Sequence, residues 1–217
     1  MAKPPARDSA SATLLVELLT EELPPRRLRA LSEAFADALI TDLRQDGFLT
    51  EKSEKRVFAT PRRLAVSISH VHEVAPDNVV TIKGPSIRSG VDASNKPTQA
   101  LIKFAEKRGV PVEQLVRVND GKQEVFAHRT MAKGSHLESN LELKVAEALN
   151  HLPVPKIMRW GAGDVQFARP VHGLVMLHGS RVVSGTVLGV ESSNSTRGHR
   201  FLAGGAVYVG DSGQDVE

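Results

Sequence analysis

One long amphipathic segment constrains the fold of this chain more than any other feature. Its apolar residues recur every three or four positions: Leu28, Leu31, Phe35, Leu39 and Leu43. Charged residues occupy the other faces, so this period predicts a helix with one buried face. Pro24 and Pro25 suit the first turn of such a helix, and Gly47 stands where a helix C-terminus favours glycine.

The segments around this helix predict strands. Residues 13–19 (TLLVELL) form a short apolar run that ends before two acidic residues and two prolines, which is typical of a buried strand. After the helix come residues 56–59 and then residues 64–71, whose alternating pattern predicts a strand with one exposed face.

The middle of the chain predicts a mixture of elements. Residues 76–96 are rich in Gly, Pro, Ser and Asn, and we expect a long functional loop or the edge of an insertion there. Residues 98–107 predict a helix, and residues 115–119 and 123–131 predict a hairpin closed around an Asp-Gly turn.

The remaining elements complete the predicted fold class. A second long amphipathic helix is expected where apolar residues again follow a helical period: Leu137, Leu141, Val145 and Leu149. Residues 173–177 and 181–190 predict a further hairpin. In this order the elements predict an α+β fold, in which antiparallel or mixed strand pairs are flanked by two long amphipathic helices.

The domain organisation follows from the same pattern. We expect a disordered N-terminal tail over residues 1–12, one α+β region over residues 13–203 with a possible internal boundary near 76–96, and a truncated continuation or flexible tail over residues 204–217. The tail has no apolar run behind its two basic residues, so it does not resemble a secretory signal.

Composition excludes several classes of function. The chain has no cysteine, which excludes disulfides and thiol nucleophiles. It contains no G-x-x-x-x-G-K-[ST], no H-E-x-x-H and no G-x-S-x-G pattern. No apolar run approaches the roughly 20 residues that a membrane span needs, so we expect a cytoplasmic protein with no membrane partner. The net charge of +3 is mildly basic; residues 1–109 carry 17 Lys/Arg against 14 Asp/Glu, and residues 110–217 carry 11 against 11.

The strongest functional candidate is the segment 153–172 (PVPKIMRWGAGDVQFARPVH). It combines the only tryptophan, Trp160, with four basic residues: Lys156, Arg159, Arg169 and His172. Its prolines and glycines predict a shaped loop that presents cations and a stacking ring, as an anionic planar partner such as RNA would require. The alternative is that Trp160 is buried and fixes the loop.

Two further pairs could join this surface. Arg62 and Arg63 lie between two strands, where one could meet a phosphate while the other pairs internally, or both could form ion pairs at the strand entry. His199 and Arg200 are followed by an aromatic residue, and they either hold phosphates or stay solvated. Glu21 and Glu22 are interpreted as structural, because carboxylates before a helix complement its positive N-terminus.

Several blocks in this order resemble one family, the β chain of bacterial two-subunit glycyl-tRNA synthetase. They are LLVELLTEELPP, FATPRRLAV, KGPSI followed by KPTQALIKFAEKRG, LPVPKIMRWG, FARPVHGLV and GHRF. The resemblance runs from about Leu14 to Phe201 and covers only the N-terminal portion of a β chain, without its anticodon-recognising C-terminal part.

The resemblance implies a function. Enzymes of this family attach glycine to tRNA(Gly) with ATP, and their class II catalytic core, with its ATP and Mg²⁺, belongs to the α chain. It implies that this chain has no catalytic, cofactor-binding or metal-binding residue of its own, and that its partners are the α subunit and tRNA(Gly). We expect a surface for RNA or subunit contact formed by Arg62, Arg63, Lys156, Arg159, Trp160, Arg169, His172, His199 and Arg200.

Two other functions stay open. The chain could be a stand-alone RNA-binding module derived from a truncated synthetase chain, which salt-dependent tRNA binding without an α chain would favour. It could also be a small-molecule enzyme that uses the His/Arg-lined loop, which a closed apolar pocket beside His172 or His199 would favour.

Overall fold

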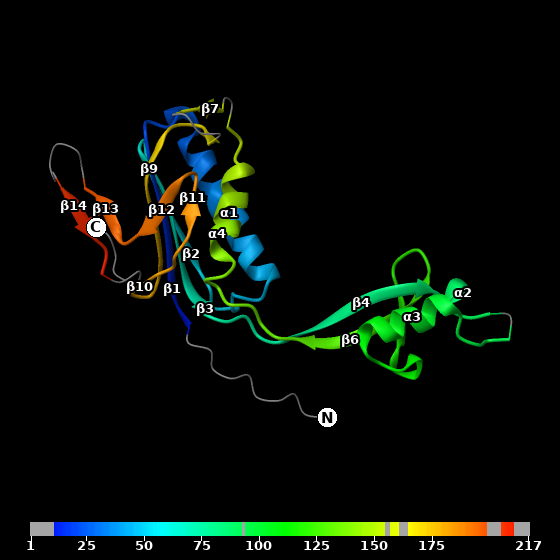
Figure 1. Ribbon diagram of the computed structural model, residues 1–217. Coiled ribbons are helices and arrows are strands. Elements are labelled where there is room, and N and C mark those ends of the chain that lie inside the picture. Colours follow the sequence, from blue (N-terminus) through cyan, green and yellow to red (C-terminus); the bar gives the residue numbers. More distant parts are fainter. Residues whose placement is uncertain (1–10, 93, 155–156, 161–164, 199–204, 211–217) are drawn as a thin grey trace. The chain divides into compact units, whose positions relative to one another are not determined.

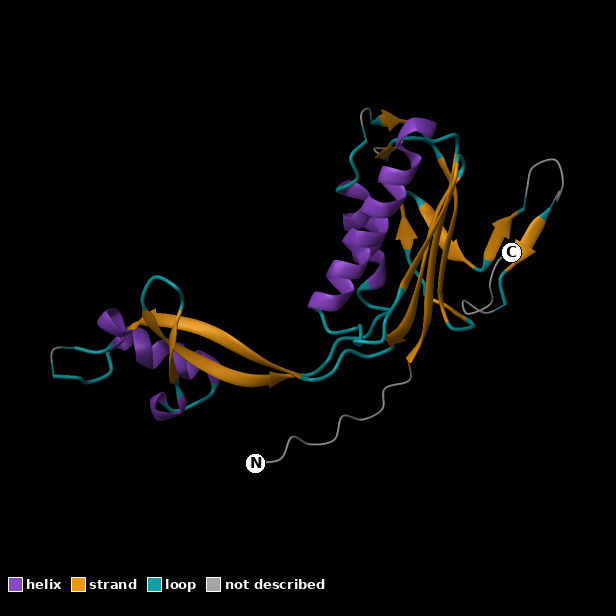
Figure 2. Cartoon of the chain, turned by 180° about the vertical axis from the view of Figure 1, so that it is seen from behind, coloured by secondary structure: helices purple, strands orange, loops and turns teal. Residues whose placement is uncertain are grey.

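The computed structural model describes residues 11–92, 94–154, 157–160, 165–198 and 205–210. The chain divides into two compact units. The sheet unit comprises Met1–Pro76 and Ser135–Glu217, and the inserted unit comprises Asp77–Gly134. Both units combine strands with helices, so the predicted α+β class is confirmed (Figures 1 and 2).

A single twisted sheet forms the centre of the sheet unit. Its strands are β1 (Ser11–Thr20), β2 (Lys55–Thr60), β3 (Arg63–His72), β9 (Val171–His178), β10 (Arg181–Val182), β11 (Thr186–Val187) and β12 (Val190–Ser193). Their order is β11-β12-β9-β1-β3-β2, with β10 paired to β9. All neighbours are antiparallel except β12 and β9, which are parallel. β1 is therefore central, and both of its neighbours run opposite to it.

Two helices cover one face of this sheet (Figure 2). They are α1 (Leu28–Gln45), which follows the short 3₁₀ helix η1 (Pro25–Arg27), and α4 (Leu141–Asn150). Alternate residues of β1 point to them, because Leu14, Val16 and Leu18 share one buried cluster with Phe35 and Leu39 of α1. Gly47 ends the α1 turn at a φ of 80°, which favours glycine.

The opposite face of the sheet carries a smaller apolar cluster. Leu15, Val175 and Leu177 pack there with Val209. Val209 follows a two-stranded ladder formed by β13 (Ser195–Arg197) and β14 (Ala206–Tyr208). A second short ladder joins β7 (Met158–Arg159) to β8 (Gln166–Phe167).

The inserted unit has its own sheet and its own core. It contains β4 (Asn78–Ser86), α2 (Ile87–Gly90), α3 (Gln99–Arg108), the 3₁₀ helix η2 (Val112–Gln114), β5 (Val116–Asn119) and β6 (Glu124–Ala132), with strand order β4-β6-β5. Leu101 and Ala105 of α3 are buried, as are Val125, Phe126 and Ala127 of β6.

Several predicted elements are confirmed. The strands around residues 13–19 and 64–71, the helix with Gly47 at its end, the helix near 98–107 and the hairpin around Asp120 are all present.

Four expectations were wrong in whole or in part. The second helix is short, because α4 begins only at Leu141 and Leu137 lies in the preceding turn. Residues 76–96 are not a long loop, since β4 pairs with β6 and α2 follows it, although the inserted unit does begin at Asp77. The hairpin predicted for residues 173–177 and 181–190 is present only between β9 and β10, and the rest of 181–190 forms β11 and the start of β12. The segment 153–172 includes the β7–β8 ladder, so it is not wholly irregular.

Candidate interaction site at the ends of β1, β3 and β9

Six of the nine predicted contact residues lie in the described part of the chain. They are Arg62, Arg63, Arg159, Trp160, Arg169 and His172. Lys156, His199 and Arg200 lie outside the described residues.

The sheet topology brings three strand ends together. Because β1 is antiparallel to both neighbours, its C-terminal end lies beside the starts of β3 and β9. The amide of Thr20 donates to the carbonyl of Arg62 at 2.9 Å, and the amide of Glu21 donates to the carbonyl of Pro170 at 2.9 Å. Residues from three distant parts of the sequence thus form one polar group at this edge.

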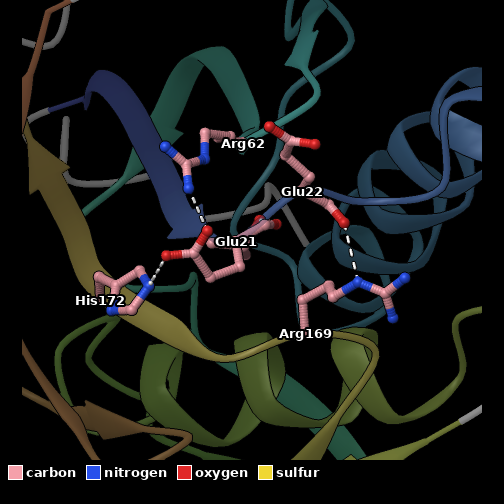
Figure 3. Close-up of polar contacts among 6 residues, drawn as sticks. Glu21, Glu22, Arg62, Arg169 and His172 are labelled. Atoms are coloured by element: carbon pink, nitrogen blue, oxygen red, sulfur yellow. Dashed lines mark hydrogen bonds and ion pairs between the residues drawn. The ribbon is translucent and has the colours of Figure 1, made fainter. Parts of the chain in front are cut away.

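Glu21 is the centre of this group. Its carboxylate forms an ion pair with Arg62, and its Oε1 lies 2.9 Å from Nε2 of His172 (Figure 3). The hydrogen bond from Arg62 lowers the pKa of Glu21 below its ordinary value of 4.5, and the bond from His172 lowers it further. We call Glu21, Arg62, Arg169 and His172 the strand-end cluster.

The structural interpretation of Glu21 as a helix-terminus residue was wrong. The first turns of η1 and α1 contain no acidic residue, and the carboxylate of Glu21 bonds to side chains of β9 and of the turn before β3. The sequence does contain two carboxylates directly after a predicted strand, but the basic residues that meet Glu21 come from distant segments.

Arg169 connects the cluster to the neighbouring backbone. Its Nε donates to the carbonyl oxygen of Glu22 at 2.8 Å (Figure 3), and its Nη1 donates to the carbonyl oxygen of Ala168 at 2.8 Å. The same Nη1 lies 3.4 Å from the sulfur of Met158 in β7. These bonds fix the start of β9 against the turn that follows β1.

Arg63 points to the opposite face of the sheet from the helices. Its Nε lies 3.5 Å from a carboxylate oxygen of Glu17, which is only 5% exposed. Thr196 donates to the same carboxylate, and Arg63 also bonds to the carbonyl of Arg197. Sequence reasoning missed Glu17, because one charged residue in an apolar strand gives no sign of its partners.

Both arginines are therefore ion-paired inside the chain, as the strand-entry interpretation predicted. Trp160 is half-buried and packs against the main apolar cluster, so its ring stabilises the loop. Arg159 beside it is exposed, as are the apolar residues Ile157 (56% exposed) and Met158 (40% exposed).

In the strand-end cluster the charge of Glu21 is balanced by Arg62, and the side chains are held in fixed orientations. In the described parts of the chain, no group of three or more His, Asp or Glu side chains could hold a metal ion. None of the described helices is long and apolar enough to cross a membrane. What the geometry provides is a set of side chains held in fixed orientations next to exposed apolar residues.

The comparison with known families decides the identity of the chain. The model of the family described as glycyl-tRNA synthetase beta subunit matches residues 14–214. The chain belongs to this family. The resemblance of the sequence blocks described above is thereby confirmed.

Curated relatives agree with this assignment. The chain is 44% identical over 197 residues to the glycine--tRNA ligase beta subunit of Neisseria meningitidis, which covers 91% of this chain and 28% of the relative. It is 44% identical over 202 residues to the beta subunit of Aromatoleum aromaticum and 43% identical over 200 residues to that of Edwardsiella ictaluri, with 92% of this chain and 29% of each relative covered. The chain thus spans less than a third of the length of these relatives.

Proposed function

We propose that this chain is the N-terminal, non-catalytic part of a glycyl-tRNA synthetase β subunit. It supports the ATP-dependent attachment of glycine to tRNA(Gly) by associating with the α subunit and by contacting the tRNA. The observation that carries this proposal is the family match over residues 14–214.

The strand-end cluster and its surroundings suit contact with the α subunit. Arg62 and Arg169 already bond to a carboxylate or to carbonyl oxygens, so a phosphate would have to displace internal partners. Ile157 and Met158 are exposed in the same part of the sheet unit, since Met158 contacts Arg169. Apolar anchors next to oriented polar groups are typical of protein interfaces.

We assign the activation of glycine by ATP to the α subunit. The described residues do not fit an ATP or Mg²⁺ site, because they form no carboxylate cluster for a metal and the sequence has no phosphate-binding glycine motif. We therefore place ATP, Mg²⁺ and the glycine pocket in the α chain, and the assembled enzyme in the cytoplasm.

Capture of the α subunit tests the association directly. The chain is immobilised and the α subunit is applied with and without tRNA(Gly). We expect Ile157→Glu combined with Met158→Glu to reduce capture at least about tenfold, as loss of an interface anchor does. The control is Leu143→Glu, which places a charge on another exposed apolar residue of the sheet unit and is expected to leave capture unchanged. Full capture by the double variant would reject this interface.

A second measurement tests the non-catalytic assignment. The chain alone, mixed with ATP, Mg²⁺ and glycine, is expected to form no glycyl-adenylate, whereas its addition to the α subunit is expected to raise aminoacylation of tRNA(Gly). Adenylate formation by the isolated chain would overturn the assignment of the reactive centre to the α subunit.

A further inference from the structure

We propose that the inserted unit is an RNA-binding module that grips the sugar-phosphate backbone through the exposed face of the β4–β6 ribbon. This inference rests on the proposed function, because it names the surface through which that function reaches tRNA.

The inserted unit holds all of the net positive charge of the chain. Residues 77–134 carry ten Lys/Arg against six Asp/Glu, a balance of +4, whereas the other 159 residues carry 18 against 19. Division of the sequence into halves hides this asymmetry. A compact unit with one dominant sign of charge attracts a polyanion.

The cations of this unit are available to a ligand. All ten are exposed: Lys83, Arg88, Lys96, Lys103, Lys107, Arg108, Arg117, Lys122, Arg129 and Lys133. Within residues 77–92 and 94–134, none of them forms an ion pair within 4.0 Å. Lys83 also lowers the pKa of Asp120 through its charge, as a weaker cause than the hydrogen bonds from the backbone amides of Gln123 and Lys122.

Two aspartates of the unit, Asp92 and Asp120, accept hydrogen bonds within their own turns. Asp120 accepts hydrogen bonds from the amides of Lys122 and Gln123, each at 2.9 Å. Asp92 accepts from the amides of Ser94 and Lys96, at 2.8 and 2.9 Å. These two carboxylates therefore stabilise loop backbone, and the described lysines and arginines of the unit have no carboxylate partner within 4.0 Å.

The β4–β6 ribbon gathers donors on one open face. Thr81 of β4 lies opposite Arg129 of β6 in the register, and Lys83 follows two residues later on the same face of β4. All three are exposed. Diagonal neighbours of this kind lie about 7–8 Å apart, so two cations and a hydroxyl can reach neighbouring phosphates of one strand.

The helix α3 packs near one end of the ribbon. A Cβ placed on Gly84 would meet the ring of Phe104 in α3 at 2.7 Å, so α3 lies against β4 at the register shift that follows Lys83. Ala127, which pairs with Lys83, is buried, whereas the side chains of Lys83 and Arg129 are exposed. The two cations are therefore accessible although the residue opposite Lys83 is covered.

RNA fits this surface better than an acidic protein does. Interfaces between proteins are built on buried aromatic and apolar anchors, and the described residues of the unit expose no large aromatic side chain. Their exposed large apolar residues are Val79, Val80 and Met131, of which Val79 and Met131 pair at the end of the same ribbon face as Thr81 and Arg129. Phe104 and Phe126 are instead covered by Arg108 and Arg117, whose guanidinium carbons lie 5.7 and 5.8 Å from the ring centres. Dispersed, unpaired cations are the pattern expected for phosphate contact.

Binding of tRNA by the whole chain tests the proposal. Fluorescence anisotropy with a labelled tRNA(Gly) transcript, and with an unrelated tRNA transcript, is measured over a range of salt concentrations in the presence of the α subunit. Lys83→Gln with Arg129→Gln is expected to weaken binding of both transcripts about tenfold near 0.1 M salt and to reduce the salt slope by about two. Equal losses for both transcripts are expected because the backbone carries no sequence information.

Two control variants make the result decisive. Arg44→Gln with Lys52→Gln removes one exposed arginine and one exposed lysine from the sheet unit, and it is expected to change binding less than about twofold. Lys83→Arg with Arg129→Lys keeps both charges and is expected to bind as the wild type does, which separates charge from folding.

Each contrary outcome has a distinct meaning. Wild-type binding by the Lys83/Arg129 variant would overturn this surface and leave the proposed function standing. Loss of α-subunit capture by that variant, with tRNA binding intact, would overturn it in favour of a protein interface. Failure of the wild-type chain with its α subunit to bind any tRNA would overturn both this inference and the tRNA contact in the proposed function.

Discussion

The two units of this chain differ in whether their basic side chains pair with carboxylates. In the sheet unit, Lys55, Arg62, Arg63, Lys144 and Arg181 form ion pairs with carboxylates. In the inserted unit, no Lys or Arg in residues 77–92 and 94–134 does so, although that unit carries the higher positive charge.

This difference shows that the role of a basic residue cannot be read from its charge alone. Whether it is bonded to a carboxylate inside the chain indicates whether it stabilises the fold or can bind a ligand. A guanidinium bonded to a carboxylate and to carbonyl oxygens orders the chain around it. An exposed ammonium without a carboxylate partner has its charge available for a ligand, and binding then releases counterions from the nucleic acid. Arg169 of segment 153–172 orders the chain through bonds to carbonyl oxygens, whereas Lys83 and Arg129 of the β4–β6 ribbon are exposed and have no carboxylate partner among the described residues.

The largest expected effect is a loss of stability in one unit only, because each unit has its own apolar core. Phe35→Ala removes a ring that is almost fully buried in the sheet unit, and it is expected to lower the free energy of unfolding by about 3–5 kcal/mol. Urea unfolding measures the loss of stability for the whole chain, and amide hydrogen exchange measures it separately for each unit. Because the main cluster contains no residue of the inserted unit, exchange protection of Val125 and Phe126 should fall less than that of Leu14 and Val16. Equal loss in both units would show that they unfold as one.

A smaller effect is expected at the buried ion pair. Glu17→Ala leaves Arg63 and Thr196 without their shared carboxylate partner, which is expected to cost about 2 kcal/mol of stability because Arg63 remains partly exposed. Thermal unfolding measures the change. Stability equal to the wild type would show that the Glu17 carboxylate adds nothing to stability through its bonds to Arg63 and Thr196.

The stability of the chain should depend on pH at two carboxylates whose pKa values are lowered for different reasons. The pKa of Glu21 is lowered chiefly by Arg62, and that of Asp120 chiefly by the backbone amide of Gln123. In both cases the stabilisation is present above the unfolded-state pKa and is lost as the pH falls through the lower folded-state value. The advantage of the wild type over Glu21→Gln, and over Asp120→Asn, should therefore shrink as the pH falls below about 4.

Salt distinguishes these two sites. Added salt screens an exposed pair of charges, so at neutral pH 0.5 M salt should reduce the melting-temperature advantage of Glu21 over its Gln variant more than that of Asp120 over its Asn variant. An equal reduction at both sites would contradict the assignment of Arg62 as the main cause at Glu21.

The smallest effect is expected on the ribbon face. Lys83→Gln with Arg129→Gln removes no ion pair, so the free energy of unfolding should change by less than about 0.5 kcal/mol. The same chemical-denaturation experiment on Arg62→Gln should give a clearer loss, because that residue has a carboxylate partner. A stability loss on the ribbon larger than that of Arg62→Gln would show that the ribbon cations hold the inserted unit together.

Local sequence patterns were sufficient to predict the elements whose contacts are formed by residues close in the sequence. The period of Leu31, Phe35 and Leu39 predicted α1, and the Asp-Gly turn predicted the β5–β6 hairpin. The strand β4 was missed because its glycine and proline content indicates a loop. Gly84 and the following Gly90 serve packing, since a Cβ at either position would lie under 3.0 Å from the rings of Phe104 or Phe126.

The candidate site was harder to predict than the fold, because its contacts are non-local. Arg62, Arg169 and His172 could be selected from the sequence as basic residues in shaped segments. Their meeting point at Glu21 depends on the antiparallel order of β1, β3 and β9, which no local pattern contains. The sequence indicated the edge of an insertion near residues 76–96, but the charge of residues 77–134 becomes visible only once both boundaries of that unit are known.

Lysine footprinting on the chain with its α subunit tests the division between the two units most directly. An amine-reactive label is applied with and without tRNA(Gly), and mass spectrometry compares Lys83 of the ribbon with Lys52 of the sheet unit, both of which are exposed. Protection of Lys83 by tRNA with unchanged labelling of Lys52 is the predicted result. Protection of Lys52 with unchanged labelling of Lys83 would contradict it.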